Sequence, residues 1–254
     1  MNNFLSQNVR RIIAADGAAT TNTPEMITWY NYDSLGRIFG KEDPLGNITR
    51  YAYDSYGNVT QIVEGTFSGQ QRITTISYNS TFTNLPALVT QPGKTTAYAY
   101  DTYGRLTSVT ITDTATSEVR TTTYTYYSNS TDGSGNVILG RLHVIDGPRT
   151  DVTDTTTYAY DSNFNLTTIT DALSHVTTVT ARDSSGRPTK VTDPNSVETD
   201  FTYDTNGRLQ TAVRAYGTAL AATYTFTYDD AGDLTMVNPH FGVRVQWVRF
   251  GLIA

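Results

Sequence analysis

The sequence contains no cysteine, only three lysines and no long apolar stretch. The absence of cysteine excludes a disulfide framework, a thiolate nucleophile and cysteine-ligated zinc, and it leaves the redox compartment open. The longest apolar stretches fall far short of the roughly 20 residues that a membrane-spanning helix needs, so we expect no membrane span. The apolar segment at residues 12–15 is also too short for a standard signal peptide.

Basic charge is scarce as well, since the chain carries a net charge of -6 and has a pI near 5.0. Proteins that bind nucleic acid or anionic lipid present a basic surface that releases counterions. This composition therefore predicts that nucleic acid is not a partner.

Threonine and tyrosine are abundant, with 47 and 18 copies respectively. β-Branched and aromatic side chains fit the pleated, half-buried surface of a sheet. The composition thus predicts an all-β fold and argues against a helical bundle or an alternating βαβ fold.

A short repeat organises the chain and consists of Tyr-Asp, two variable residues, Gly, a polar residue and an aliphatic residue. Its five clear copies contain Tyr32, Asp33 and Gly36; Tyr53, Asp54 and Gly57; Tyr100, Asp101 and Gly104; Tyr203, Asp204 and Gly207; and Tyr228, Asp229 and Gly232. Weaker copies begin at residues 78, 126, 160 and 182, and the copy at 126 carries an insertion at residues 128–137. About nine units follow one another at intervals of about 21 to 26 residues, with one gap of 34.

Each unit is typical of two antiparallel strands and two turns. The Asp can accept hydrogen bonds from amides two residues on, and the Gly supplies the positive φ of a tight turn. Aromatic residues two positions apart, such as Tyr98 and Tyr100, predict one face of a strand. Apolar residues three apart after the turn, such as Leu106 and Val109, suggest a bulge there. A second turn, for example at residues 43–47, closes the unit.

On these residues, the chain resembles the YD repeats of the RHS (rearrangement hotspot) family, found also in teneurins and wall-associated bacterial proteins. The resemblance covers most of the chain. It implies repeated β-hairpins in a spiralling, solenoid-like or shell-like ribbon, which in relatives surrounds a toxin or builds an adhesive structure. This chain is shorter than the large shell proteins, and it lacks the Asn- and Tyr-rich C-terminal core region that precedes their self-cleavage site.

Three regions follow from the pattern: residues 1–29 as an N-terminal cap or tail, residues 30–236 as the repeat domain, and residues 237–254 as a C-terminal edge strand. The apolar spacing at residues 4–13 is typical of a helix. The C-terminal strand alternates strongly, and exposed edges of this kind recruit other strands. Its expected assembly residues are Val243, Val245, Trp247 and Phe250.

Catalytic chemistry is not expected from this sequence. An Asp that recurs in every unit is explained by the turn, and Asp43 before Pro44 lies in an ordinary turn although it resembles the family's self-cleavage element. The three histidines, His143, His175 and His240, lack metal-ligand spacing. The insertion lacks the terminal acidic ligand of an EF-hand. We therefore expect no catalytic, cofactor-binding or metal-binding residues.

The predicted function is that of a non-enzymatic structural protein, extracellular or at the surface of a bacterial cell. Two interpretations stay open. In one, the chain polymerises end to end into a filament or tube; in the other, it is a fragment of a shell or adhesin that encloses a toxin or binds glycan through its tyrosines. Sequons at Asn47, Asn58, Asn79, Asn129 and Asn165 would matter only on a glycosylating route.

Overall fold

The computed structural model describes residues 10–13, 27–65, 71–127, 140–215, 218, 221–239 and 245–246. These residues form twenty β-strands joined by turns and loops, with no helix among them. The chain divides into two compact units, Met1–Thr123 and Tyr124–Ala254. The all-β prediction is thus confirmed.

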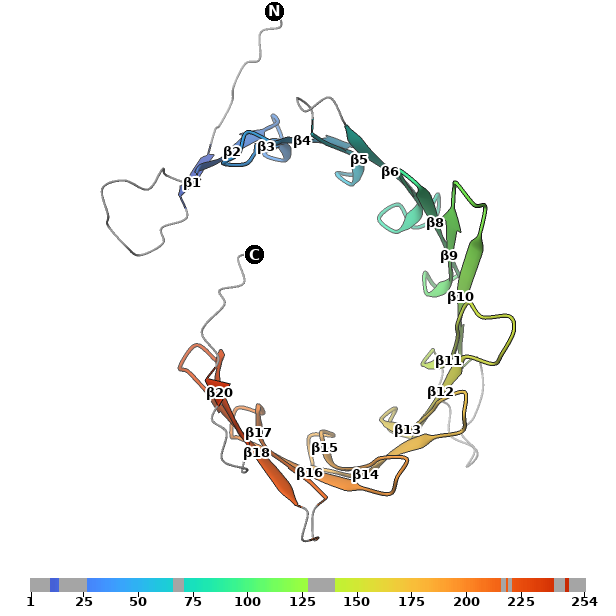
Figure 1. Ribbon diagram of the computed structural model, residues 1–254, viewed down its shortest axis with the longest axis vertical. Coiled ribbons are helices and arrows are strands. Elements are labelled where there is room, and N and C mark those ends of the chain that lie inside the picture. Colours follow the sequence, from blue (N-terminus) through green and yellow to red (C-terminus); the bar gives the residue numbers. More distant parts are fainter. Residues whose placement is uncertain are drawn as a thin grey trace, which may run out of the picture. The chain divides into compact units, whose positions relative to one another are not determined.

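In the first unit, each strand pairs antiparallel with the next strand along the chain (Figure 1). The strands are β1 (Arg10–Ile13), β2 (Ile27–Tyr32), β3 (Ile38–Glu42), β4 (Ile48–Tyr53), β5 (Val59–Glu64), β6 (Arg72–Tyr78), β7 (Pro86–Gln91), β8 (Lys94–Tyr100), β9 (Leu106–Asp113) and β10 (Val119–Tyr126), whose last three residues belong to the second unit. The helix expected near the N-terminus is wrong for residues 10–13, because they form β1 and pair with β2.

The second unit repeats the same meander. Its strands are β11 (Leu142–Asp146), β12 (Thr155–Tyr160), β13 (Leu166–Thr170), β14 (Val176–Arg182), β15 (Pro188–Thr192), β16 (Glu198–Tyr203), β17 (Leu209–Arg214), β18 (Ala222–Tyr228), β19 (Leu234–Pro239) and β20 (Val245–Gln246). Each strand of this unit pairs with the next strand along the chain, so each hairpin is joined directly to the following one.

A bulge follows the turn of each well-defined repeat, as the sequence predicts. In the β4–β5 hairpin, Ala52 lies opposite Gln61 while Tyr53 lies opposite Val59, so the returning strand holds one extra residue. The same register shift precedes Tyr78, Tyr100, Tyr203 and Tyr228. An extra residue strengthens the local twist and re-aims the neighbouring side chains.

The two faces of the sheet differ in chemistry, because side chains alternate along each strand. On one face, Tyr98 lies opposite Val109 and Tyr100 lies opposite Leu106; we call this the tyrosine face. The other face, the threonine face, is rich in small hydroxyl side chains. A row of four threonines crosses adjacent strands there: Thr75, Thr90, Thr95 and Thr112.

The sheet has almost no hidden interior. Among the residues whose exposure is described, only Gly40 and Thr74 are buried, and most strand residues are half-buried. A conventional domain instead buries most of its apolar side chains between two layers. Contacts between neighbouring hairpins, at the junctions between repeats, must therefore hold much of the fold in place.

Candidate functional site: the junction between repeats

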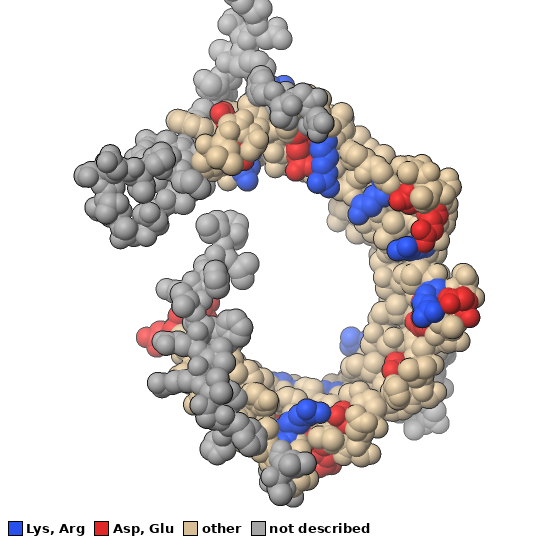
Figure 2. Space-filling model, viewed as in Figure 1, with Lys and Arg blue, Asp and Glu red and all other residues tan. Residues whose placement is uncertain are grey.

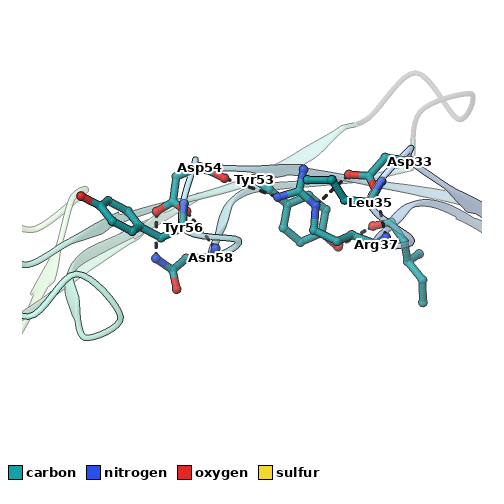
Figure 3. A network of polar contacts seen from close by, with 8 residues as sticks. Asp33, Leu35, Arg37, Tyr53, Asp54, Tyr56 and Asn58 are labelled. Atoms are coloured by element: carbon teal, nitrogen blue, oxygen red, sulfur yellow. Dashed lines mark hydrogen bonds and ion pairs between the residues drawn. The ribbon is translucent and has the colours of Figure 1, made fainter.

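Each repeat begins with a turn organised by its aspartate, shown for Asp33 in Figure 3. Asp33 Oδ1 accepts hydrogen bonds from the amides of Leu35 and Arg37, both at 2.9 Å. Its Oδ2 accepts a bond from Arg37 Nε at 2.7 Å. The Gly36 amide donates to the Asp33 carbonyl at 3.0 Å, and Gly36 has a φ of 77°. In this turn the aspartate accepts backbone amides and the glycine has a positive φ.

The second turn of the unit has the same geometry, which the sequence did not reveal. In ten turns on both edges of the sheet, a carboxylate accepts the amide four residues on. The ten acids are Asp33, Asp43, Asp54, Asp101, Asp161, Asp171, Asp183, Asp193, Asp204 and Asp229. Asp43, which precedes Pro44, is therefore an ordinary member of the set.

Hydrogen bonding lowers the pKa of several of these acids, of which Asp33 and Asp101 are examples. The Arg37 amide contributes most to lowering the pKa of Asp33; the Arg37 side chain and the Leu35 amide add to it, and together they outweigh partial desolvation. At Asp101, partial desolvation is the largest single influence and raises the pKa. The bonds from Arg105 and Tyr103 outweigh it, so the net pKa of Asp101 is also lowered. At neutral pH both acids are therefore ionised, and their carboxylates act as hydrogen-bond acceptors in the turns.

The arginine of one turn also reaches the next repeat. The Arg37 guanidinium lies 4.5 Å from the centre of the Tyr53 ring, and the Tyr53 hydroxyl donates back to the Ile38 carbonyl (Figure 3). One arginine therefore joins its own aspartate to the tyrosine of the following hairpin. A cation over an aromatic face is worth about 0.5–1 kcal/mol at exposed sites.

Two junctions in the second unit repeat this arrangement. Arg187 lies 4.5 Å from the Tyr203 ring centre, and the Tyr203 hydroxyl donates to the Pro188 carbonyl at 2.7 Å. Arg208 lies 4.7 Å from the Tyr228 ring centre, with a matching bond from Tyr228 to a carbonyl of the preceding strand at 2.9 Å. The sequence pattern predicted that these tyrosines share one face, but it did not predict the partners of their hydroxyl groups.

Other junctions keep part of the contact. Tyr78 donates to the Val59 carbonyl and Tyr100 to the Pro86 carbonyl, both at 2.8 Å. In the copy that starts at residue 182, Arg182 replaces the tyrosine and its Nη2 donates to the Leu166 carbonyl. The backbone acceptor is thus more constant than the donor that reaches it.

The remaining candidate groups do not form a reactive cluster. His143 stacks on Tyr127 with ring centres 4.2 Å apart, and His175 Nδ1 pairs with its turn acid Asp171 at 2.9 Å. Within the described ranges, no three His, Asp or Glu side chains lie together as a metal site would need. Residue 240 and the insertion at 128–137 lie outside the described residues.

The expected assembly strand is described only at Val245–Gln246. There, Val245 lies opposite Val237 of β19, while Val243, Trp247 and Phe250 fall outside the described residues. No helix in the part of the chain that the structure covers is long and apolar enough to cross a membrane.

Charged side chains are mostly paired, and Figure 2 shows acidic and basic atoms next to each other on a largely uncharged surface. A shallow depression of about 170 Å³ near the start of β10 is one such place, where Arg120 pairs with Glu118 at 2.8 Å. Its other lining residues are Lys94, Ile111 and Asp113. Paired, exposed charges of this kind contribute little to binding or stability.

Comparison with known proteins agrees with the repeat geometry. The family model described as RHS Repeat matches residues 32–66 and 182–219. No curated protein matches the chain.

Among solved structures, the TcdB2-TccC3 crystal structure is similar with a TM-score of 0.51 and 15% identity, over 89% of this chain and 14% of that one. The TcdB2-TccC3-Cdc42 structure has a TM-score of 0.48 and 18% identity, over 87% and 11%. The Tc holotoxin pore from Photorhabdus luminescens has a TM-score of 0.41 and 17% identity, over 84% and 13%. The chain spans only a small part of these relatives, and the likeness is one of fold.

Proposed function

We propose that this chain, which is built from RHS repeats, is a non-enzymatic wall segment of an RHS-type shell whose tyrosine face contacts an enclosed polypeptide. The observation that carries the proposal is the series of hairpins within each unit, where each strand is bonded to the next, in a sheet whose aromatic face has no second layer among the described residues. A similar fold occurs in the TcdB2-TccC3 crystal structure.

The junction chemistry supports a structural role. Turn carboxylates such as Asp33 and Asp101 are occupied by amides and arginines, which suits a rigid support better than proton transfer. The tyrosine hydroxyls at the junctions are also occupied by backbone carbonyls. What the tyrosine face leaves available is aromatic and aliphatic surface, which suits contact with an incompletely folded chain.

Binding of a permanently unfolded client protein to the purified chain tests the proposal. Val109 and Thr110 are neighbours on β9 but lie on opposite faces: Val109 opposite Tyr98, and Thr110 opposite Ala97. We expect V109K to weaken client binding in a fluorescence anisotropy titration and T110K to leave it nearly unchanged. Thermal unfolding of both variants shows whether each remains folded.

The two outcomes that contradict the proposal are clear. Absence of client binding by the folded parent chain would remove the enclosure role, and equal weakening by both lysines would remove the assignment to the tyrosine face. End-to-end polymerisation and glycan binding stay predictions from the sequence, and no contact among the described residues favours either.

A further inference from the structure

Three exposed asparagines hold the same place in the same kind of turn, two residues after the turn aspartate: Asn163, Asn195 and Asn206. Each donates its backbone amide to that aspartate's carboxylate at 2.9 Å. The residue after each asparagine has a positive φ, which is 63° at Phe164, 62° at Ser196 and 81° at Gly207. The amide of this next residue donates to the carbonyl of the turn aspartate at 2.9 or 3.0 Å. The three turns therefore match in backbone bonding and differ in the side chain that follows the asparagine.

That difference governs the chemistry of the asparagine. The backbone nitrogen of the next residue can attack the side-chain carbonyl carbon Cγ, because both atoms belong to the same stretch of chain. A side chain on the next residue crowds this nitrogen, whereas glycine leaves it open to close approach. The chain contains a single Asn-Gly pair, Asn206 and Gly207, and both residues are exposed at the turn.

The neighbouring turn explains why glycine stands at position 207. A Cβ on Gly207 would lie 2.8 Å from Arg187 Nη1, so the arginine would have to move. Arg187 is held in place by its ion pair with Asp183 at 2.7 Å and by its position 4.5 Å from the centre of the Tyr203 ring. At Gly36, in contrast, a Cβ would meet nothing within 4 Å. Packing at this junction thus favours the reactive pair over the serine or phenylalanine that the other two turns accept.

We propose that Asn206 is a site of spontaneous deamidation and isoaspartate formation, a modification that opens this turn as the protein ages. The Gly207 nitrogen loses its proton and attacks Asn206 Cγ, the Cγ–Nδ2 bond breaks, and the amide group leaves as ammonia with that proton. The five-membered imide then takes up one water, and either of its two ring C–N bonds that end at residue 207 breaks. One product is aspartate and the other is isoaspartate. The reaction needs a brief opening of the turn, since the Gly207 amide is bonded to the Asp204 carbonyl at 2.9 Å.

Isoaspartate changes the turn more than the added charge does. It routes the backbone through the side-chain carbon, so the chain between Asp204 and Arg208 becomes one methylene longer. In the unmodified turn, Asp204 Oδ1 accepts the amides of Asn206 and Arg208 at 2.9 Å, and its Oδ2 accepts Arg208 Nε at 2.7 Å. A longer turn cannot keep all of these bonds. Because Arg208 also lies 4.7 Å from the centre of the Tyr228 ring, the contact with the next hairpin weakens as well.

Incubation of the intact chain at mildly alkaline pH, followed by isoelectric focusing, tests the site. We expect a form with one more negative charge than the parent chain, whose net charge is -6. Peptide mapping with enzymatic methylation of isoaspartate locates the change. The rate at Asn206 should be at least about tenfold that at Asn195 or Asn163, a barrier difference of about 1.4 kcal/mol or more. This modification goes beyond the wall role, and its absence would leave client binding untouched.

Two variants serve as matched controls. N206S places at this turn the residue that Ser185 provides in the preceding Tyr-Asp-type turn, so the turn is kept and the acidic form from this peptide should disappear. S196G places glycine after Asn195 in a turn of the same geometry, and it should raise the rate at Asn195 to within about tenfold of that at Asn206. Equal rates at the three asparagines of the parent chain, an unchanged rate in S196G, or an acidic form that maps elsewhere would overturn the assignment.

Hydrogen exchange measures the opening of the turn. N206D carries the added charge on a normal backbone, so its β16 and β17 amides should exchange like those of the fresh parent chain. The same amides should exchange faster in the isoaspartate form of the aged parent. Equal exchange in the isoaspartate form and in N206D would refute the opening of the turn.

Discussion

Replacing the turn glycines by alanine tests the turn geometry most directly. Gly57 and Gly104 hold the same position in their turns, with φ values of 91° and 78°. An L-residue in this left-handed region costs about 1–2 kcal/mol. Alanine recovers about 0.4–1 kcal/mol by restricting the unfolded chain. We therefore expect G57A to lower the free energy of unfolding by about 0.5–1 kcal/mol, the difference between these effects.

G104A should lower the free energy of unfolding further, because the space around Gly104 is already occupied. A Cβ at Gly57 would meet nothing within 4 Å, whereas one at Gly104 would lie 3.2 Å from Cε1 of Phe82. The Phe82 ring must then shift, so G104A should exceed G57A. G104V should be worse again, because a β-branched residue tolerates positive φ poorly.

The reverse substitution provides the control. Ser196 already has a φ of 62° at this turn position, and Ser174 has 66°. S196G removes that strain and should not destabilise the chain. Urea unfolding followed by circular dichroism measures all of these variants, and hydrogen exchange of the affected hairpin detects local opening that a global transition would hide. Equal stabilities for G57A and G104A, or strong destabilisation by S196G, would refute the reasoning.

Three further outcomes follow from the same contacts. The lowered pKa of acids such as Asp33 means that their stabilising effect is present above the ordinary value of 3.8 and is lost as the pH falls below it; acid titration of thermal stability should show a steep decline there, and a flat profile would contradict it. D101A loses three hydrogen bonds to its turn. By analogy with helix caps, we expect it to lower the free energy of unfolding in urea by roughly 1 kcal/mol, and an unchanged stability would contradict the turn assignment. Y78F removes the bond to Val59 and should cost about 1 kcal/mol, whereas Y56F, at a ring that is 71% exposed, should cost almost nothing in the same assay.

Local structure was largely predictable from the sequence. The Asp-to-Gly spacing predicted the turn, the aromatic pairs predicted the shared face, and the three-residue apolar spacing after the turn predicted the bulge. These features depend on residues close together in the chain, where a side chain and the backbone that it contacts are separated by at most four positions. Short-range geometry of this kind is readable from spacing alone.

Contacts between hairpins were not predictable in the same way. The bond from Tyr78 to Val59 spans 19 positions, and the stacking of Arg37 on Tyr53 spans 16. Each depends on the register of neighbouring strands, which the bulge shifts by one residue. The shared geometry of the second turn was not predictable either, because Pro44 stands where the Tyr-Asp turns hold a polar residue and Ser196 stands where most of them hold glycine. The two turn sets share their backbone geometry and their leading aspartate.

The copy with Arg182 shows what the junction requires. A tyrosine and an arginine differ in charge and shape, yet both are long side chains that end in a hydrogen-bond donor. Arg182 reaches the Leu166 carbonyl, the acceptor equivalent to Ile38 for Tyr53, and it also donates to the Gly186 carbonyl at 2.8 Å. The repeat therefore preserves a donor directed at the preceding strand more strictly than it preserves an aromatic ring. Since such a donor joins six of the hairpins to the one before, degenerate copies can still continue the ribbon within each unit.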